Sequence, residues 1–247
     1  MNIKAAIVFL SSALLLLSSC ARYQTKYAHE TDGWLTKQVD STRVLSHSMY
    51  LIGDAGYSQE ETSSPVVKYL KKSLASETEN SSVIFLGDNI YQSGMPPKAQ
   101  SGERAEAEFR IEAQLNVVDD FAGYPLFIPG NHDWRGWGVD GLYRQEKYIQ
   151  KHINKKRGIE DKENYENYFL PTGGCSGPEV VELNDDVVIM AIDSQWWLTD
   201  WDKVKHINDG CELKNREHFV FEFENIARKY RNKQVVIAMH YPMFTYG

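Results

Sequence analysis

Residues 83–91 have the sequence Val-Ile-Phe-Leu-Gly-Asp-Asn-Ile-Tyr, and this stretch decides how the chain folds. Four consecutive apolar residues suit a strand that is buried on both faces, because such a strand shows no alternation of apolar and polar side chains. Gly87 then allows the backbone to turn sharply. The stretch therefore predicts a buried strand that ends in a loop and delivers Asp88 at its carboxyl end.

The same unit recurs on both sides of this stretch. The other copies are Met49–Ile52 before Gly53-Asp54, Tyr124–Ile128 before Pro129-Gly130-Asn131-His132, and Gln234–Met239 before His240. Apolar residues at helical spacing predict helices over residues 65–74 and about 103–118, between the first three strands. This alternation predicts an α/β fold in which helices pack against a largely parallel sheet.

The rest of the chain adds further elements to one domain. Residues 180–183 and 187–192 are expected to form two strands around a turn, and residues 219–230 contain apolar side chains at helical spacing. We expect the domain to span residues 48–247, which is long enough to bury one sizeable core.

Polar side chains follow four of the predicted strands: Asp54, Asp88, Asn131 with His132, and His240. Ligands of open α/β sheets bind in the crevice outside the carboxyl ends of the strands. Carboxylate, amide and imidazole donors without thiolate suit iron, manganese or zinc better than a closed structural zinc site. Two cations about 3.5–4 Å apart that share a carboxylate promote in-line displacement at phosphorus.

Four motifs resemble the ordered motifs of the calcineurin-like metallophosphoesterases. They are Gly53-Asp54-Ala55-Gly56, Gly87-Asp88-Asn89-Ile90-Tyr91, Gly130-Asn131-His132-Asp133 and Met239-His240-Tyr241-Pro242. Most of that family has Asp-X-His at the first motif, where this chain has Gly56. Purple acid phosphatases also lack this histidine and have a tyrosine shortly after the second-motif aspartate, in the place of Tyr91. In its motif pattern, the chain is therefore most similar to that branch.

The resemblance implies a centre of two metal ions, iron paired with iron, zinc or manganese. Asp54 and Tyr91 would bind the first, ferric ion, and Asn131 and His240 would bind the second, while Asp88 would bridge both. A phenolate ligand favours ferric iron because a hard, highly charged cation stabilises the deprotonated oxygen.

The resemblance also implies the fold and the reaction. The fold would be a central β-sandwich flanked by helices. His132 would be catalytic and would stabilise or protonate the departing alkoxide, while a metal-bound hydroxide attacks phosphorus. The expected activity is a phosphomonoesterase of the acid phosphatase kind, acting on a small phosphorylated substrate. Two alternatives remain: a phosphodiesterase or pyrophosphate-cleaving hydrolase of the same fold, and a non-catalytic envelope lipoprotein on a degenerate hydrolase scaffold.

One family motif has no counterpart in the sequence. The resemblance assigns one histidine to each metal from a Gly-His-X-His motif, and the chain contains no His-X-His. It stops at Gly247, just after the motif that contains His240. We therefore expect a C-terminally incomplete domain without the last strands, and a form that is inactive or a poor enzyme.

The N-terminal residues predict export to a cell envelope. Lys4 is followed by an apolar run that is too short to span a bilayer as a helix, and Leu17-Ser18-Ser19-Cys20 ends it. This ending looks like a bacterial lipobox, so residues 1–19 are expected to be a signal peptide and Cys20 the lipidated first residue. Residues 20–47 would form a tether. The expected location is the bacterial envelope, lipid-anchored on the periplasmic or outer-membrane face.

Charge and cysteine content agree with this picture. The chain has 27 Lys and Arg against 34 Asp and Glu, and no basic run that would grip a nucleic-acid backbone, so we expect no nucleic-acid partner. Once Cys20 is assigned to lipid, Cys175 and Cys211 remain. In an oxidising compartment this pair can form a disulfide, and we expect the two cysteines to be joined, with two free thiols as the alternative.

Several tryptophans lie shortly after motif or strand ends: Trp134, Trp137, Trp196, Trp197 and Trp201. The sequence leaves open whether some of them wall a substrate pocket or whether all are ordinary core and rim aromatics.

Overall fold

The computed structural model describes residue 42 and residues 44–59, 64–199 and 207–243. The predicted signal peptide, Cys20 and most of the predicted tether lie outside these residues, as does Trp201. All the described helices and strands belong to the compact unit Leu45–Gly247. Within the described ranges, no helix combines the length and the apolar character that a membrane crossing requires.

Six strands are described, and five of them contain no charged residue: β1 (Ser48–Ile52), β2 (Ser81–Phe85), β3 (Tyr124–Phe127), β4 (Glu179–Glu182), β5 (Val187–Ala191) and β6 (Gln234–Ala238). All six lie within a residue or two of the strands that the sequence predicts. Apolar runs were sufficient here because each strand has at least one face in a core.

The helices comprise both predicted and unpredicted ones: α3 (Pro65–Leu74), α4 (Ser101–Val118), α5 (Asn131–Trp134), α6 (Gly138–Lys156), α7 (Ser194–Leu198) and α8 (Arg216–Lys229), with short 3-10 turns η1 (Lys162–Asn164) and η2 (Thr172–Gly174). Helix α6 is not among the predicted helices, although Leu142, Ile149 and Ile153 follow helical spacing and are all buried. Its two early glycines and many polar residues concealed the pattern.

The strands form two three-stranded sheets rather than one. In the first sheet, β1 and β3 lie on either side of β2, and both pairings are parallel. In the second sheet, β5 lies between β4, which is antiparallel to it, and β6, which is parallel. The expectation of a largely parallel sheet therefore holds for each sheet except at β4.

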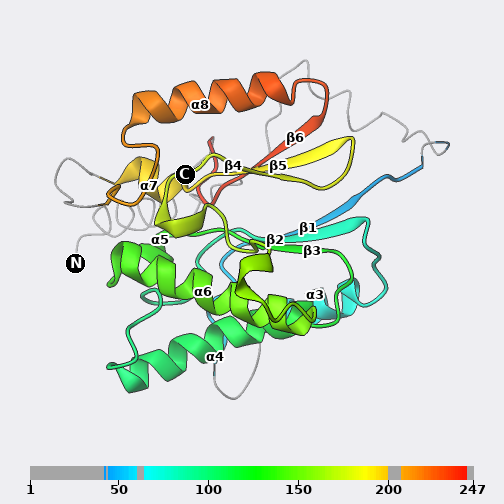
Figure 1. Ribbon diagram of the computed structural model, residues 1–247. Helices are drawn as coiled ribbons and strands as arrows, with labels where there is room; N and C mark the ends of the chain where they lie inside the picture. Colours follow the sequence, from blue (N-terminus) through cyan, green and yellow to red (C-terminus); the bar gives the residue numbers. More distant parts are fainter. Residues whose placement is uncertain (1–41, 43, 60–63, 200–206, 244–247) are drawn as a thin grey trace, which may run out of the picture. The chain divides into compact units, whose positions relative to one another are not determined.

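The two sheets pack face to face between two layers of helices (Figure 1). Alternate residues of β2 establish this arrangement. Val83 and Phe85 belong to the core beneath α3, α4 and α6, whereas Ile84 belongs to the core between the sheets. In β5, Ile189 faces the inter-sheet core, and Met190 faces the core that contains residues of α7 and α8. The architecture is thus a mixed α/β sandwich flanked by helices, as predicted.

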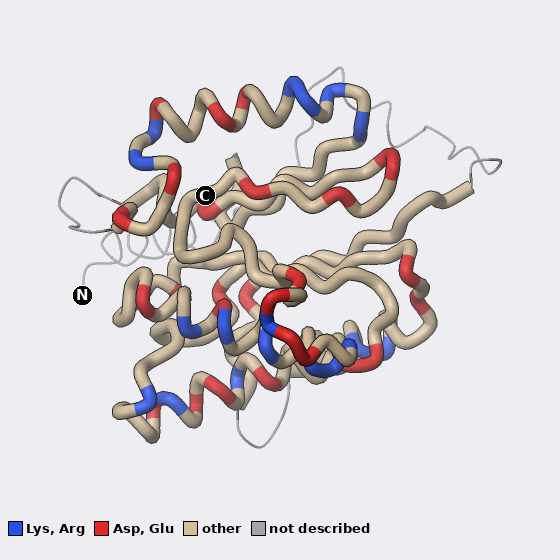
Figure 2. The backbone as a smooth tube through the Cα atoms, in the orientation of Figure 1, with Lys and Arg blue, Asp and Glu red and all other residues tan. Residues whose placement is uncertain are grey.

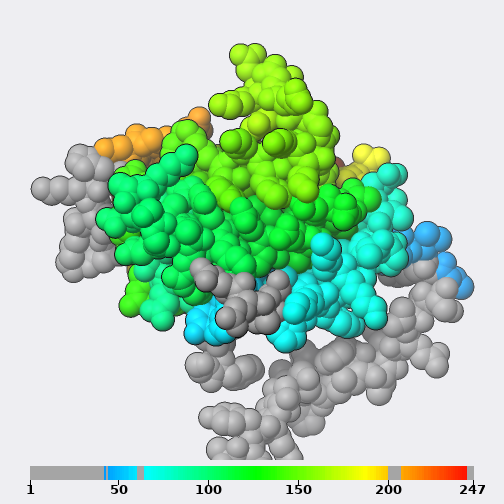
Figure 3. Space-filling view, turned by 90° about the horizontal axis from the view of Figure 1, so that it is seen from below, coloured from blue at the N-terminus to red at the C-terminus, as the bar shows by residue number. Residues whose placement is uncertain are grey.

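The outer helices shield the sheets from solvent. Basic residues (Lys and Arg) and acidic residues (Asp and Glu) both occur along α4, α6 and α8, whereas β1, β2 and β3 carry no charge (Figure 2). Figure 3 shows one helical face, over which residues of α3, α4 and α6 gather in cyan to light green. A solvated outer face on each helix is therefore matched by an apolar inner face on the sheet.

A disulfide joins Cys175 and Cys211, as the sequence predicts. The Cα atoms are 5.6 Å apart, and 36 positions of sequence separate the two residues. The bond links the turn before β4 to the segment that precedes α8, so it fixes the second helical layer near the sheet edge.

Candidate metal centre

Two aspartates leave their strands in the same unusual backbone conformation. Asp54 follows β1 and Asp88 follows β2, with φ values of 56° and 55°. These values lie in the left-handed region, which is uncommon for residues other than glycine. Because the strands are parallel neighbours, the two loops turn in the same way and bring both carboxylates to one edge of the first sheet.

Tyr91 connects these two carboxylates. Its hydroxyl oxygen lies 2.6 Å from Oδ1 of Asp54 and 2.8 Å from Oδ2 of Asp88. A phenol has one hydrogen to donate, so it can satisfy only one of the two contacts. Burial, followed by the hydrogen bonds to Asp54 and Asp88, raises the pKa of Tyr91 above its ordinary value. Three oxygens therefore meet with a single proton between them.

His240 brings a second group of donors together from the other sheet. Its Nδ1 lies 2.8 Å from the carbonyl oxygen of Leu86, which can only accept, so Nδ1 carries the hydrogen. The lone pair of the neutral ring is then on Nε2, which lies 3.0 Å from Oδ1 of Asn131 and 3.6 Å from Oδ1 of Asp88. A histidine that binds a metal through one ring nitrogen usually donates a hydrogen bond from its other ring nitrogen, for example to a backbone carbonyl.

Asp88 belongs to both groups. Its Oδ2 faces Tyr91, whereas its Oδ1 faces His240 and also accepts a hydrogen bond from the backbone amide of His132 at 2.8 Å. Asp88 is only 3% exposed. The structure thus gathers all five predicted ligands, namely Asp54, Asp88, Tyr91, Asn131 and His240.

These donors suit metal cations, although they supply only part of the ligand set for each cation. Oxygen and nitrogen lone pairs that face one another with too few protons between them are stabilised by a positive charge. A set of oxygen donors and imidazole nitrogen suits iron, zinc or manganese. Among the described residues, no three His, Cys, Asp or Glu side chains form a group that could hold a metal ion. The phenol of Tyr91 and the amide of Asn131 are therefore needed to complete each group.

The family model for calcineurin-like phosphoesterases matches residues 47–247. The chain belongs to the calcineurin-like phosphoesterase family. Members of this family are metal-dependent phosphoester hydrolases that generally bind two metal ions. A comparison with curated proteins finds no match.

In this calcineurin-like phosphoesterase, the backbone explains why glycine occupies position 56. A Cβ atom there would lie 2.3 Å from the carbonyl carbon of Asn89 and 2.5 Å from the carbonyl oxygen of Asp88. The amide of Gly56 also donates to that Asp88 oxygen at 3.0 Å. Close contact between the first two loops therefore excludes a side chain from the position where most relatives have histidine.

Asp133 has a structural role that was not predicted from the sequence. This carboxylate is fully buried and accepts hydrogen bonds from the backbone amides of Gly130, Asn89 and Ile90 at 2.8, 3.0 and 3.1 Å. Burial raises its pKa to about 6, while the backbone hydrogen bonds act in the opposite direction. Asp133 thus fixes the loop after β2 to the loop after β3. Its place in the first turn after Gly130, where carboxylates commonly cap helices, was an available signal.

His132 lies beside the donors without joining them. Its Nδ1 is 2.9 Å from the carbonyl oxygen of Gln92, and its ring centroid is 4.3 Å from that of Tyr91. Since the carbonyl accepts, Nδ1 carries a hydrogen. The other nitrogen, Nε2, is the atom that can exchange a proton with a substrate.

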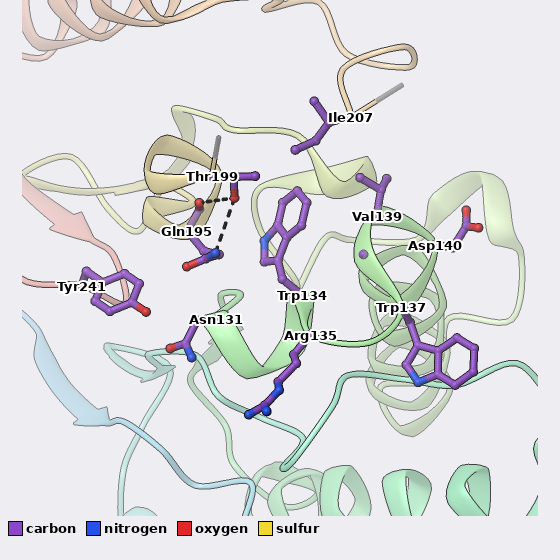
Figure 4. Close-up of a pocket in the computed structure, with 11 residues that line it drawn as sticks. Asn131, Trp134, Arg135, Trp137, Val139, Asp140, Gln195, Thr199, Ile207 and Tyr241 are labelled. Atoms are coloured by element: carbon purple, nitrogen blue, oxygen red, sulfur yellow. Dashed lines mark hydrogen bonds between the residues drawn. The ribbon is translucent and has the colours of Figure 1, made fainter. Parts of the chain in front are cut away.

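A cavity of about 780 Å³ opens beside the donors (Figure 4). It shares Asn131 with the second donor group and is lined further by Trp134, Arg135, Trp137, Gly138, Val139, Asp140, Gln195, Thr199, Ile207 and Tyr241. Trp196, in contrast, is fully buried in the core near α8. Among the described tryptophans that the sequence left unassigned, Trp134 and Trp137 line this cavity, whereas Trp196 and Trp197 belong to or pack against the core near α8.

Proposed function

We propose that this chain is a phosphomonoesterase that uses a dinuclear metal centre of the purple acid phosphatase type. The observation that carries the proposal is the position of Asp88. One of its oxygens faces Tyr91, which also contacts Asp54, and the other faces His240. A carboxylate between two donor groups is what a pair of cations requires.

Asp54 and Tyr91 would hold one cation, and Asn131 and His240 would hold the other. The preference for iron at the first position rests on the phenol of Tyr91, and iron, zinc or manganese would suit the second. When bound, the cations supply Lewis acidity toward phosphate oxygens and lower the pKa of water.

His132 would protonate the departing alkoxide. The carbonyl of Gln92 keeps a hydrogen on Nδ1, so the proton that the imidazolium ring gives up is the one on Nε2. The neutral ring that remains is still held by Gln92. His132 can therefore act as a general acid without turning during the reaction.

The sequence lacks the two histidines that relatives supply from Gly-His-X-His. Each cation would then have one nitrogen donor fewer than in those relatives. Tests of the 247-residue chain therefore supply metal in excess.

Metal content and hydrolysis test the proposal together. The full chain, incubated with iron, zinc or manganese, should hold two cations and release nitrophenol from an aryl phosphate. Asp88→Asn keeps the shape of the side chain but removes its charge, and it should lose both cations and activity. Asp185→Asn, in the exposed turn between β4 and β5, is the matched control. Two cations that persist in Asp88→Asn would refute the bridging role, and absence of both cations and turnover in the wild type would favour a non-catalytic scaffold.

We also propose that the protein is a lipid-anchored component of a bacterial envelope, acting on small phosphorylated molecules there. The support is the order of Lys4, an apolar run and Leu17-Ser18-Ser19-Cys20 in the sequence. Stable anchoring needs two membrane signals, which diacylation of Cys20 would supply. Cys20→Ala should prevent incorporation of a fatty-acid analogue, and normal labelling of this variant would refute the assignment.

A further inference from the structure

We propose that the cavity beside Asn131 binds the alcohol half of the phosphoester, and that this half carries a planar aromatic ring. The inference rests on the proposed function and names its substrate class. A volume of about 780 Å³ is far more than a phosphate group needs, and it lies within the usual range of about 300–1,000 Å³ for small-molecule sites. An ester whose phosphate lies at the donors would place its alcohol half here.

The walls of the cavity suit a flat ring. Two indoles, Trp134 and Trp137, and the phenol of Tyr241 contribute aromatic surface, while Val139 and Ile207 add aliphatic surface. In Figure 4 the indole of Trp134 stands between the Gln195–Thr199 pair on one side and Val139 on the other. Aromatic rings prefer such surroundings because offset and edge contacts add to the free energy of burial.

Trp134 is fixed in its position. Its Nε1 donates a hydrogen bond to Oδ2 of Asp193 at 2.7 Å, and Asp193 is fully buried and caps α7. Rotation of the indole would leave a buried carboxylate without one of its donors, which is unfavourable. The wall that Trp134 forms is therefore set before a ligand enters, and little conformational entropy of this side chain is lost when a ring binds.

Polar groups at the edge can bind ring substituents. Nε2 of Gln195 lies 3.4 Å from the hydroxyl of Thr199. The exposed guanidinium of Arg135 has no side-chain hydrogen bond or ion pair among the described residues, and it points to the same side of Trp134 as Asn131 (Figure 4). A cation beside an aromatic ligand is favourable. An aryl alcohol and a nucleoside both carry a planar ring with polar substituents, so both fit this cavity.

Calorimetric titration of the full chain with phosphate-free alcohols tests the cavity independently of hydrolysis. The probes are 2-naphthol for an aryl alcohol, adenosine for a nucleoside, and cyclohexanol as a ring that is not planar. At least one aromatic probe should bind at least about tenfold more tightly than cyclohexanol. The aromatic probe that binds more tightly shows whether the alcohol half is an aryl alcohol or a nucleoside. Equal affinity for all three probes, or no binding of either aromatic probe, would overturn the proposal.

Val139→Phe narrows the cavity from α6 and should weaken aromatic binding by about tenfold or more. Val220→Phe makes the same change on α8, where Val220 is 44% exposed, and should leave the affinity unchanged. If Val139→Phe does not fold by circular dichroism, Asp140→Phe replaces it, because Asp140 lines the cavity but is exposed. Unchanged affinity in the folded variant would overturn the proposal. Binding without hydrolysis of any ester would refute the proposed function and leave the cavity assignment intact.

Discussion

The indole Nε1 of Trp134 donates a hydrogen bond to Oδ2 of Asp193 at 2.7 Å. Trp134 ends the short helix α5 after β3 in the first sheet, whereas Asp193 follows β5 in the second. Together with the contact between His240 and the carbonyl of Leu86, this bond ties the two sheets together at the end where the metal donors lie. Burial raises the pKa of Asp193 to about 7, although hydrogen bonds from Trp196 and Trp134 act in the opposite direction.

We expect Asp193 to make stability depend on pH. Its folded-state pKa of about 7 lies above the ordinary value of 3.8, so the folded protein binds the proton more tightly. The stabilisation is fully present below the ordinary pKa and is lost as the pH rises through 7, by at most about 1.4 kcal/mol for each pH unit. Asp193→Asn removes this titration. The melting temperature of the wild type, relative to that of the variant, should rise as the pH falls from about 8 to about 5.

The control for this experiment is Asp140→Asn, which changes an exposed carboxylate on α6. The difference in melting temperature between this variant and the wild type should stay nearly constant over the same pH range. A constant difference for Asp193→Asn as well would mean that Asp193 does not titrate in this window.

His132→Ala should separate chemistry from metal binding. The ring of His132 contacts the carbonyl of Gln92 and makes no hydrogen bond to a donor side chain among the described residues. Its bond to Asp88 comes from the backbone amide, which alanine keeps, so both cations should remain. Loss of the general acid should lower kcat by roughly 10²–10⁴-fold. The measurements are metal content and kcat, with His152→Ala, whose ring contacts Asp119 instead, as the control. Loss of a cation in His132→Ala would show that this histidine is a ligand.

Tyr91→Phe tests the assignment of iron. Ferric phenolate absorbs visible light by charge transfer, so the iron-loaded wild type should be coloured and the variant colourless. Tyr57→Phe is a close control, because the rings of Tyr57 and Tyr91 are 6.0 Å apart and Tyr57 makes no hydrogen bond to Asp54 or Asp88 among the described contacts. A colourless iron-loaded wild type would contradict the purple acid phosphatase assignment.

Gly56→Ala should destabilise the protein by about 1–3 kcal/mol, because a well-packed site cannot accept an added methyl group without backbone movement. The new Cβ would lie 2.3 Å from the carbonyl carbon of Asn89. Gly102→Ala in the first turn of α4 adds the same group where nothing lies within 4 Å. It should stabilise the protein by about 0.4–1 kcal/mol, because alanine has less backbone freedom than glycine in the unfolded chain. Urea unfolding measures the free energy of unfolding of both variants. Equal stability of the two variants would mean that the loops at Gly56 adjust freely.

The order of residues along the chain determined the strands and the types of donor. Four consecutive apolar residues at Val83–Leu86 are a local pattern, and so is the Gly-Asp that follows. Because parallel strands end at one edge of a sheet, Asp54, Asp88 and Asn131 could be expected to meet there. The role of Tyr91 was expected only from the resemblance to purple acid phosphatases, which have a tyrosine at the same distance after the second-motif aspartate.

Only the tertiary structure decided which atoms face one another. Asn131 and His240 are 109 positions apart in the sequence, and local pattern gives no distance between such residues. The separation into two sheets, the buried clamp of Asp133 and the cavity at Trp134 also depend on packing between elements. The physical reason is that strand formation follows from the side chains of a few neighbouring residues. A metal centre or a pocket, in contrast, depends on how the sheets and helices pack to exclude water.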